Sequence, residues 1–426
     1  MYLRKVEIRN VRSIARFVWE APPDPAGWHV LIGDNGSGKT TILRSIALAL
    51  LGTNEEAYAL REDWRRWIRH QQDTATIRLE FRGDPDCDPA ARAPSDDNDF
   101  IAVTFDKKLD FDGVGESVDA AYHTGRGWFS ASYGPFRRFA GDDEEDRKLY
   151  GTHPRLARHI TLFGDRYALS GCIPWLISLK HRELAAQQQG AGDDHPDVRA
   201  LNAVVAFVNQ PGFLPHGTQL SEITADHVRF RDGNGAPVTL QELSDGYRSV
   251  LGMTLELLRQ LLGAYDLDRV FDPAHPAHVS APGVVLIDEV DAHLHPTWQR
   301  DVGYWLRKHF PRIQFLVTTH SPIVCRAATR GSVYRLPVPG TDETATRIEG
   351  PELDRLLYGN VLEAYGTGVF GADVTRSQEG TQRLHRLAEL NVKELDEGLT
   401  PEEEDEQEGL RAALPTAAHT QDPAQP

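Results

Sequence analysis

A glycine-rich segment near the start of the chain, residues 33–40, reads Gly-Asp-Asn-Gly-Ser-Gly-Lys-Thr. An apolar run typical of a buried strand precedes it at residues 28–32, and a pattern typical of a buried helix follows at residues 41–51. Glycines allow backbone N–H groups to turn inward around the oxygens of an anion, and the start of a helix adds a partial positive charge. The segment therefore predicts a phosphate-binding loop between a strand and a helix.

Two side chains of this loop suit a nucleoside triphosphate bound with magnesium. Lys39 is expected to reach the β- and γ-phosphates, and the hydroxyl of Thr40 is expected to take one position on the magnesium ion. The alternative is a glycine-rich turn with a surface lysine, which the strand before the loop and the helix after it disfavour. The residues expected to contact the nucleotide here are Gly33, Asn35, Gly36, Ser37, Gly38, Lys39, Thr40 and Thr41.

A pair of acidic residues ends another buried strand. Residues 283–287 read Gly-Val-Val-Leu-Ile and are followed by Asp288 and Glu289. Beside the phosphate loop, Asp288 is expected to hold magnesium through water, and Glu289 to polarise the attacking water. Such a pair is common at strand ends, so this interpretation depends on the phosphate loop. A helical pattern and a second apolar strand at residues 313–318 follow, which together predict a parallel βαβ unit.

Three of the histidines within or just beyond this unit are candidates for a functional site. His320 follows the second strand, and its position one βαβ unit after the acidic pair predicts a γ-phosphate sensor. The alternative is a loop histidine that caps a turn. His293 and His295 have an alternate spacing that would suit two ligands of a zinc ion. Because no third ligand is evident, a loop that faces a dimer partner is favoured over zinc.

The segment at residues 243–249 reads Leu-Ser-Asp-Gly-Tyr-Arg-Ser and opens a helix predicted at residues 247–262. Ser244 and Gly246 combine a hydroxyl group, a bare backbone and a helix N-terminus, which suits an anion. Taken alone, this segment favours a capped helix start without a ligand.

As a set, these segments resemble the ABC ATPase family, and within it the SMC/RecF-like and OLD-like branch. Residues 33–40 resemble Walker A, residues 243–248 the LSGGQ-type signature, and residues 284–289 Walker B. Residues 291–296 resemble the D-loop, and His320 resembles the histidine of the H-loop. Residues 6–13 also resemble the start of that branch, where an arginine such as Arg12 lies near the nucleotide.

The resemblance implies ATP and Mg²⁺ as cofactors and ATP hydrolysis as the activity, with Lys39, Glu289 and His320 as catalytic residues. In this family the signature of one subunit contacts the γ-phosphate bound by its partner. Ser244 and Gly246 are therefore expected to complete the site of a second copy, so that ATP joins a homodimer and hydrolysis releases it. The implied fold is an α/β ABC ATPase head with a mixed or parallel P-loop sheet, an N-terminal antiparallel β lobe and a short inserted helical hairpin.

Some features depart from the family pattern. Asp245 stands where the signature usually has glycine, and no glutamine lies at an obvious lobe junction, although residues 132–138 mark that region. The insertion, with helices predicted at residues 172–189 and 197–209, is too short for a long coiled coil. The chain after His320 is too short for the nuclease domain of full OLD proteins.

This layout resembles the small standalone ATPases of Septu-type anti-phage systems and of retrons. The resemblance implies a role in anti-phage defence and a separate effector protein, expected to be a nuclease. A RecF-like DNA-repair ATPase and a non-catalytic scaffold that holds ATP are the alternatives.

Five parts are expected along the chain. They are the N-terminal part of the head with Walker A (1–140), an inserted helical hairpin and β lobe (141–240), the C-terminal part of the head with signature, Walker B and His320 (241–340), a C-terminal helical extension (341–405) and a disordered tail (406–426). Two strands are predicted in the insertion, at residues 220–230 and 236–240.

Charge and composition bear on partners and compartment. The formal net charge is −17, which does not steer the protein to nucleic acid, although a local basic groove can still bind it. Residues 61–69 interleave tryptophans with arginines, and an amphipathic helix with buried tryptophans is favoured over a surface that stacks bases. Arg137 and Arg138 are left open between nucleotide, DNA and no ligand. No apolar run predicts a membrane span, and three widely spaced cysteines fit a reducing cytoplasm.

Overall fold

The computed structural model describes residues 1–51, 54–84, 87, 100–107, 110–114, 128–137, 152–164, 169, 171–190, 192–271, 278–341, 343–360, 364 and 378–414. The chain divides into two units, Met1–Tyr358 and Gly359–Pro426. Each unit is described by itself.

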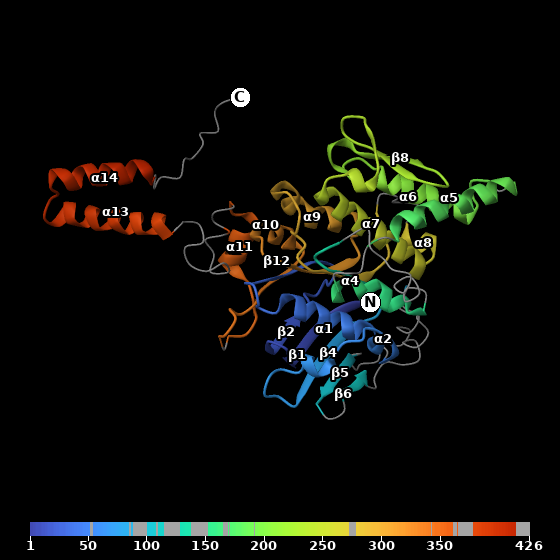
Figure 1. The fold of residues 1–426 in the computed structure, drawn as a ribbon, viewed down its shortest axis with the longest axis horizontal. Helices are drawn as coiled ribbons and strands as arrows, with labels where there is room; N and C mark the ends of the chain where they lie inside the picture. Colours follow the sequence, from blue (N-terminus) through green and yellow to red (C-terminus); the bar gives the residue numbers. More distant parts are fainter. Residues whose placement is uncertain are drawn as a thin grey trace. The chain divides into compact units, whose positions relative to one another are not determined.

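In the first unit, the described strands form three sheets with helices between them (Figure 1). The strands are β1 (Tyr2–Val11), β2 (Ile14–Glu20), β3 (Gly27–Ile32), β4 (Thr74–Arg82), β5 (Phe100–Asp106), β6 (Asp110–Val114), β7 (Ser130–Tyr133), β8 (Gln219–Ile223), β9 (Val228–Arg231), β10 (Pro237–Val238), β11 (Gly283–Ile287), β12 (Ile313–Thr319), β13 (Gly331–Arg335) and β14 (Thr346–Arg347). The α-helices are α1 (Lys39–Leu51), α2 (Asn54–Ala59), α4 (Pro154–Phe163), α5 (Cys172–Gln188), α6 (Pro196–Val208), α7 (Asp245–Ala264), α8 (Leu267–Val270), α9 (Pro296–His309), α10 (Pro322–Cys325) and α11 (Gly350–Tyr358). Short 3₁₀ helices are η1 (Trp64–Trp67), η4 (Pro215–Gly217), η5 (Leu240–Glu242) and η6 (Arg326–Thr329).

The sheet that carries the phosphate loop has the strand order β14-β13-β3-β12-β11-β7. All its strands run parallel except β14, which pairs antiparallel with β13. Every residue of β3, β11 and β12 is buried, as expected for parallel strands that are covered on both faces. The predicted βαβ unit is confirmed as β11, α9 and β12. Because parallel strands end at the same edge, the segments after β3, β11 and β12 lie together.

The N-terminal sheet is antiparallel, with the strand order β2-β1-β4-β5-β6. Burial alternates along β4 and β5, because one face packs on the core that includes α1 while the other faces outward. The two larger sheets are joined by the buried side chain of Gln314 on β12. Its Oε1 accepts from Leu3 N at 2.7 Å and its Nε2 donates to Leu3 O at 2.9 Å, at a point where the register of β1 shifts. The predicted antiparallel β lobe and mixed sheet are confirmed.

The inserted helical hairpin is also confirmed, as α5 and α6, which lie beside the small sheet β10-β9-β8 (Figure 1). The prediction of one strand across residues 220–230 is wrong. Thr224 N donates to His227 O at 2.9 Å, and Thr224 Oγ1 accepts from the N–H groups of Asp226 and His227. This threonine turn divides the segment into β8 and β9, because its side chain satisfies the backbone donors of a turn.

The second unit contains an antiparallel helix pair, α13 (Gln378–Asp396) and α14 (Pro401–Ala413). The prediction of a disordered tail is wrong for residues 406–413, which belong to α14. Thr400 and Glu403 form a reciprocal capping box at its start, and Arg386 binds Glu406 at 2.8 Å. Glu402, Glu403 and Glu404 thus lie in the first turn of a helix, whose N-terminus favours negative charge. Residues 415–426 lie outside the described part of the chain.

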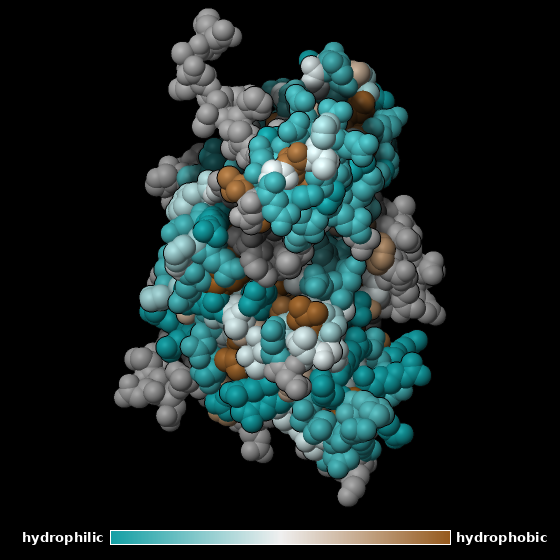
Figure 2. Space-filling model, turned by 90° about the vertical axis from the view of Figure 1, so that its left-hand side faces the viewer, coloured by the Kyte–Doolittle hydropathy of each residue, from teal (hydrophilic) through white to brown (hydrophobic). Residues whose placement is uncertain are grey.

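The surface shown in Figure 2 is mainly hydrophilic, with small separated hydrophobic spots. The three cysteines, Cys87, Cys172 and Cys325, are buried and form no disulfide. Among the described residues, no helix is long and apolar enough to cross a membrane.

Two completely buried histidines, His29 and His159, should make the first unit less stable in acid. Burial lowers the pKa of His29 to about 4 and that of His159 to about 3, from 6.5. Below pH 6.5 the unfolded chain takes up protons that the folded chain cannot, so the free energy of unfolding should fall. At pH 5 the loss is about 2 kcal/mol for each histidine. Urea unfolding at pH 7.5 and pH 5.0 measures the difference in the free energy of unfolding. In His29→Gln this difference should be smaller by the contribution of one histidine. An unchanged difference in that variant would show that His29 does not cause the loss of stability.

Candidate nucleotide site

The phosphate loop joins β3 to α1 and has the conformation that its glycines permit. Gly36 and Gly38 have φ values of +80° and +95°, which residues with side chains rarely adopt. Helix α1 begins at Lys39, so the unpaired N–H groups of its first turn lie at the loop. The strand before and the helix after the loop are both present, as the sequence predicts.

Lys39 folds back over the loop. Its Nζ donates to the main-chain oxygens of Gly33 at 2.7 Å and Asp34 at 2.8 Å. Burial lowers the pKa of Lys39, and the carboxylates of Asp288 and other acidic residues nearby oppose this shift. An ammonium group has three donors, and the described residues accept from two of them, which leaves one for a ligand. The buried Ser37 Oγ has no hydrogen-bond partner among the described residues. A phosphate oxygen would satisfy such groups, so the loop fits a triphosphate.

The loop meets the end of β11 through a pair of oxygen ligands. Thr40 Oγ1 donates to Asp288 Oδ2 at 2.7 Å, a contact between residues 248 positions apart in the sequence. Thr318 Oγ1 donates to the other carboxylate oxygen of Asp288 at 2.5 Å. Asp288 is completely buried. Mg²⁺ prefers such oxygen ligands and takes few of them from the protein, with phosphate oxygens and waters completing the shell. Thr40 and Asp288 therefore fit magnesium bound with a triphosphate.

Glu289 stands on the turn that follows β11 and has a strained backbone. Its φ is +45°, which costs a residue other than glycine about 1 kcal/mol or more. Its N–H donates to Thr318 Oγ1 at 2.8 Å. One threonine of β12 thus orients both acidic residues, the first through its side chain and the second through its backbone. Glu289 is partly exposed, so its carboxylate is accessible at the strand edge.

The sequence left the role of Arg137 open, and the structure places it against this turn. Its guanidinium Nη2 donates to Glu289 O at 2.7 Å and to Asp288 O at 3.0 Å, and its Nη1 donates to Ser249 Oγ at 3.1 Å. The segment after β7 that the sequence marks as a lobe junction therefore lies beside β11, as the parallel pairing of these strands requires. No spacing rule predicts this contact, because the partners come from three separate segments. Arg138 lies outside the described residues.

His320 follows β12 directly and is half-buried at the same edge. Its neighbour Thr319 donates from Oγ1 to Asp291 Oδ1 at 2.5 Å, so the strand end is tied to the turn after the acidic pair. His295 accepts from Thr297 N–H and caps α9, while His293 is exposed with a φ of +65°. His320 and the acidic pair thus follow neighbouring parallel strands at one edge of the sheet. The role of His320 as a γ-phosphate sensor stays a prediction.

The predicted anion site at Ser244 is the start of α7, a helix of 20 residues. Ser244 is exposed, and its side chain makes no capping hydrogen bond among the described residues. The interpretation as a serine-capped helix start is wrong in this respect. A methyl group on Gly246 would lie 3.1 Å from His293 O, so the helix start packs next to the turn after β11. Arg248 pairs with Asp245 and donates to Gln241 O.

Arg12, the remaining residue expected to bind nucleotide, lies at the turn between β1 and β2. Its guanidinium carbon lies 4.4 Å from the centre of the Trp67 ring, and its Nη2 lies 3.6 Å from Glu62. The same turn adjoins the phosphate loop, since a methyl group on Gly38 would lie 3.1 Å from the Ile14 side chain. Arg12 is thus near the loop, held by stacking and an ion pair.

A protein-family profile described as "AAA domain, putative AbiEii toxin, Type IV TA system" (AAA_21) matches residues 51–326, more than half of the chain. The chain belongs to the AAA_21 family. The matched range begins after the phosphate loop and includes Ser244, the acidic pair and His320.

Curated proteins similar to this AAA_21 chain carry the names of the two systems that the sequence layout resembles, which confirms that resemblance. A "Septu protein PtuA" of Bacillus mycoides (strain KBAB4) is 25% identical over 335 residues, 78% of this chain and 40% of that protein. A "Retron Ec83 probable ATPase" of Escherichia coli is 34% identical over 124 residues, 29% of this chain and 22% of that protein. The chain thus spans less than half of the length of these relatives.

Solved structures also resemble the AAA_21 chain in fold. An SMC head bound to the C-terminal winged-helix domain of ScpA covers 83% of this chain and 99% of its own, with 13% identity and a TM-score of 0.47. The recombination mediator protein RecF, in a structure described as "RecF-ATPrS", covers 82% of this chain and 98% of its own, with 12% identity and a TM-score of 0.43.

The tryptophans of residues 61–69 belong to the core of the AAA_21 chain. Trp64 and Trp67 are 3% and 0% exposed, and their rings stack on Phe105, whereas Arg65 and Arg66 are exposed. The favoured interpretation is confirmed, although the segment is the 3₁₀ helix η1. Bases cannot stack on rings that the core already covers.

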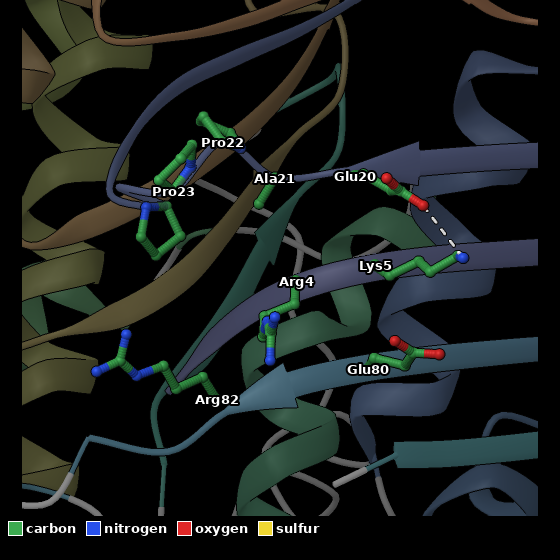
Figure 3. A pocket seen from close by; sticks show the side chains of 9 residues that line it. Arg4, Lys5, Glu20, Ala21, Pro22, Pro23, Glu80 and Arg82 are labelled. Atoms are coloured by element: carbon green, nitrogen blue, oxygen red, sulfur yellow. Dashed lines mark ion pairs between the residues drawn. The ribbon is translucent and has the colours of Figure 1, made fainter. Parts of the chain in front are cut away.

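A groove of about 680 Å³ lies at the other end of the N-terminal sheet (Figure 3). Charged side chains of both signs line it, among them Arg4, Arg82 and Glu80, and Lys5 pairs with Glu20 at 3.1 Å. It lies at the start of β1, whereas the phosphate loop adjoins the turn at the end of β1. The strand between them spans roughly 30 Å, so this groove is separate from the nucleotide site.

Proposed function

We propose that the chain is an Mg²⁺-dependent ATPase that acts as a nucleotide-driven dimerisation switch. The observation that carries this proposal is the hydrogen bond between Thr40 and Asp288, because it joins the phosphate loop and the acidic strand end into one site. Membership of the AAA_21 family and similarity to proteins named probable ATPases support it. The fit of Lys39 and Ser37 to phosphate oxygens supports ATP as the ligand.

In this proposal, the residues of the site divide the work of hydrolysis. The loop amides and Lys39 bind the phosphates, and Thr40 and Asp288 hold magnesium, which neutralises charge on the transferring phosphoryl group. Glu289 orients the attacking water and accepts its proton, and His320 contacts the γ-phosphate. Arg12 lies at the side of the loop, where the rest of the nucleotide extends.

The proposed dimer is supported by the start of α7. Ser244 is exposed and does not cap its own helix. The helix N-terminus therefore presents unpaired N–H groups and a hydroxyl to solvent, a combination that binds anions. In a second copy placed head to tail, Ser244 and Gly246 would contact the γ-phosphate held by the first copy. ATP binding then stabilises the dimer, and hydrolysis weakens it.

The names of the relatives support a role in anti-phage defence, in which the switch gates a separate effector nuclease. Purification of the tagged chain from its native host with Mg-ATP, followed by mass spectrometry, tests this part. Recovery of a nuclease in stoichiometric amounts is expected. Recovery of recombination proteins instead would contradict it in favour of DNA repair.

The ATPase proposal is tested by phosphate release and by sedimentation with Mg-ATP or Mg-ADP. Turnover is expected, with dimers in ATP and monomers in ADP. ATP-dependent dimers without any turnover, with or without DNA and effector, would favour the non-catalytic scaffold and contradict the enzyme.

Replacement of Lys39 by alanine should abolish stabilisation by nucleotide. At a concentration one hundred times its Kd, ATP should stabilise the wild type by about 2.7 kcal/mol, seen as a higher unfolding temperature. The variant lacks the ammonium that binds the phosphates, so its unfolding temperature should not change with ATP. Equal shifts in both proteins would show that ATP binds elsewhere.

A further inference from the structure

Arg137 is a buried arginine whose donors go mainly to the backbone. Only 6% of it is exposed. Its two terminal nitrogens bind Asp288 O, Glu289 O and Ser249 Oγ within 3.1 Å, and Nη1 lies 3.5 Å from Val290 O. Three successive carbonyl oxygens of the turn after β11 thus surround one guanidinium group.

The environment of Arg137 is costly for a positive charge. Burial lowers the pKa of Arg137 to about 10, and the carboxylates of Asp291, Asp288 and Glu289 oppose that shift. The group remains charged at neutral pH. Burial of such an ion is unfavourable unless its partners compensate for the lost hydration. Because its hydrogen-bond partners among the described residues are main-chain oxygens and one hydroxyl, its contacts fix the path of the backbone.

The backbone that it fixes is strained at one residue. Glu289 has a φ of +45°, and both of its peptide groups are held: its N–H by Thr318 and its C=O by Arg137. A non-glycine residue keeps such a conformation only where its surroundings over-determine it. Without the guanidinium, the turn would lose the partner of its carbonyl and relax toward ordinary backbone angles.

The same side chain reaches α7, the helix that follows Ser244. Ser249 lies on the second turn of α7, and Arg137 Nη1 joins it to the turn that carries Glu289. The segment that carries Arg137 packs closely at its start, because a methyl group on Gly134, directly after β7, would lie 2.2 Å from Thr161 O of α4. The hydrogen bonds of Arg137 place its guanidinium group at the junction of β11 and α7.

We propose that Arg137 is a positioning residue of the ATPase site, which holds the Glu289 turn in its strained conformation and anchors it to α7. This inference rests on the proposed function for its kinetic consequences. Its structural consequence, the stability of the turn in the nucleotide-free protein, does not rest on the proposed function.

Steady-state kinetics distinguish a positioning role of Arg137 from a general loss of folding or activity. Arg137→Lys and Arg137→Met should lower kcat about 100-fold, as expected when a catalytic group is misplaced by about 1 Å, while the KM for ATP changes less than threefold. Arg307→Met is the matched control, because Arg307 also donates to a main-chain oxygen, that of Ala327, but near the far end of α9. The kcat of this variant should match that of the wild type.

Adding Arg137→Met to Glu289→Gln should cause no further loss of kcat, because Arg137 acts through Glu289. Equal kcat in Arg137→Lys and the wild type, or additive losses, would overturn the proposal.

Hydrogen exchange of the nucleotide-free protein tests the inference without turnover. In Arg137→Lys, the amides of residues 289–294 should exchange at least tenfold faster than in the wild type, while those of β12 keep their rates. The conservative lysine keeps the charge, so folding is retained in this variant. Unchanged exchange at residues 289–294 would overturn the inference even if ATP hydrolysis were normal. A wild type without turnover but with this exchange pattern would instead contradict the proposed function alone.

Discussion

Replacement of Glu289 by glutamine should lower ATP turnover by about 10²–10⁴-fold, the usual contribution of a general base. Glutamine keeps the size of the side chain and its place on the turn, but it cannot accept the proton of the attacking water. Binding of ATP through Lys39 and the loop amides should be unaffected. ATP-bound dimers should therefore accumulate, because the step that releases them is blocked. Phosphate release and sedimentation on the same samples measure both effects.

The contrast with a nearby carboxylate sharpens this test. Asp291→Asn alters a carboxylate of the same turn that binds Thr319 rather than facing the proposed water, so its loss of turnover should be smaller than that of Glu289→Gln. If Glu289→Gln hydrolysed ATP within tenfold of the wild type, Glu289 would not be the base.

Replacement of Ser244 by arginine should abolish both ATP-dependent dimers and turnover while leaving nucleotide binding intact. The long charged side chain would occupy the exposed start of α7, where the proposed partner's γ-phosphate must approach closely. The phosphate loop of the same chain is formed by other segments, so each monomer should still bind ATP. Binding of a fluorescent ATP analogue and sedimentation with Mg-ATP measure the two properties separately.

Ser221→Arg is the matched control for this variant, since it makes the same substitution at an exposed residue of β8. It should leave dimers and turnover at wild-type levels. If the Ser244→Arg protein still dimerised with ATP, the start of α7 would not be part of the dimer interface.

Local patterns predicted much of this fold and site. The order of loop, acidic pair and histidine placed three strand ends at one edge of the sheet, and the hairpin α5–α6 followed from its helical periodicity. These features depend on neighbours in the sequence. The sequence predicts that Thr40 and Asp288 lie at one magnesium ion, and the structure joins them directly by a hydrogen bond.

The features that the sequence did not predict depend on contacts between distant segments or on hydrogen bonds within turns. Arg137 meets Glu289 and Ser249 across more than one hundred positions, and a single arginine after a strand carries no sign of such partners. The turn at Thr224 was missed because its threonine looks like a strand residue. The predicted boundary of a disordered tail at residue 406 falls inside α14, although the capping box of Thr400 and Glu403 indicates a helix start.

The central claim is that each ATP is held by the phosphate loop of one copy and the α7 start of another. Mixing two inactive variants, Lys39→Ala and Ser244→Arg, tests it most directly. In a mixed dimer, one of the two sites combines an intact Lys39 with an intact Ser244. Neither variant should form ATP-dependent dimers by itself, so the dimers in the mixture are mixed ones. Each has one complete site of two, so turnover of up to about half of the wild-type value should return. If no mixture of the two variants hydrolyses ATP while the wild type does, the site is not shared between copies.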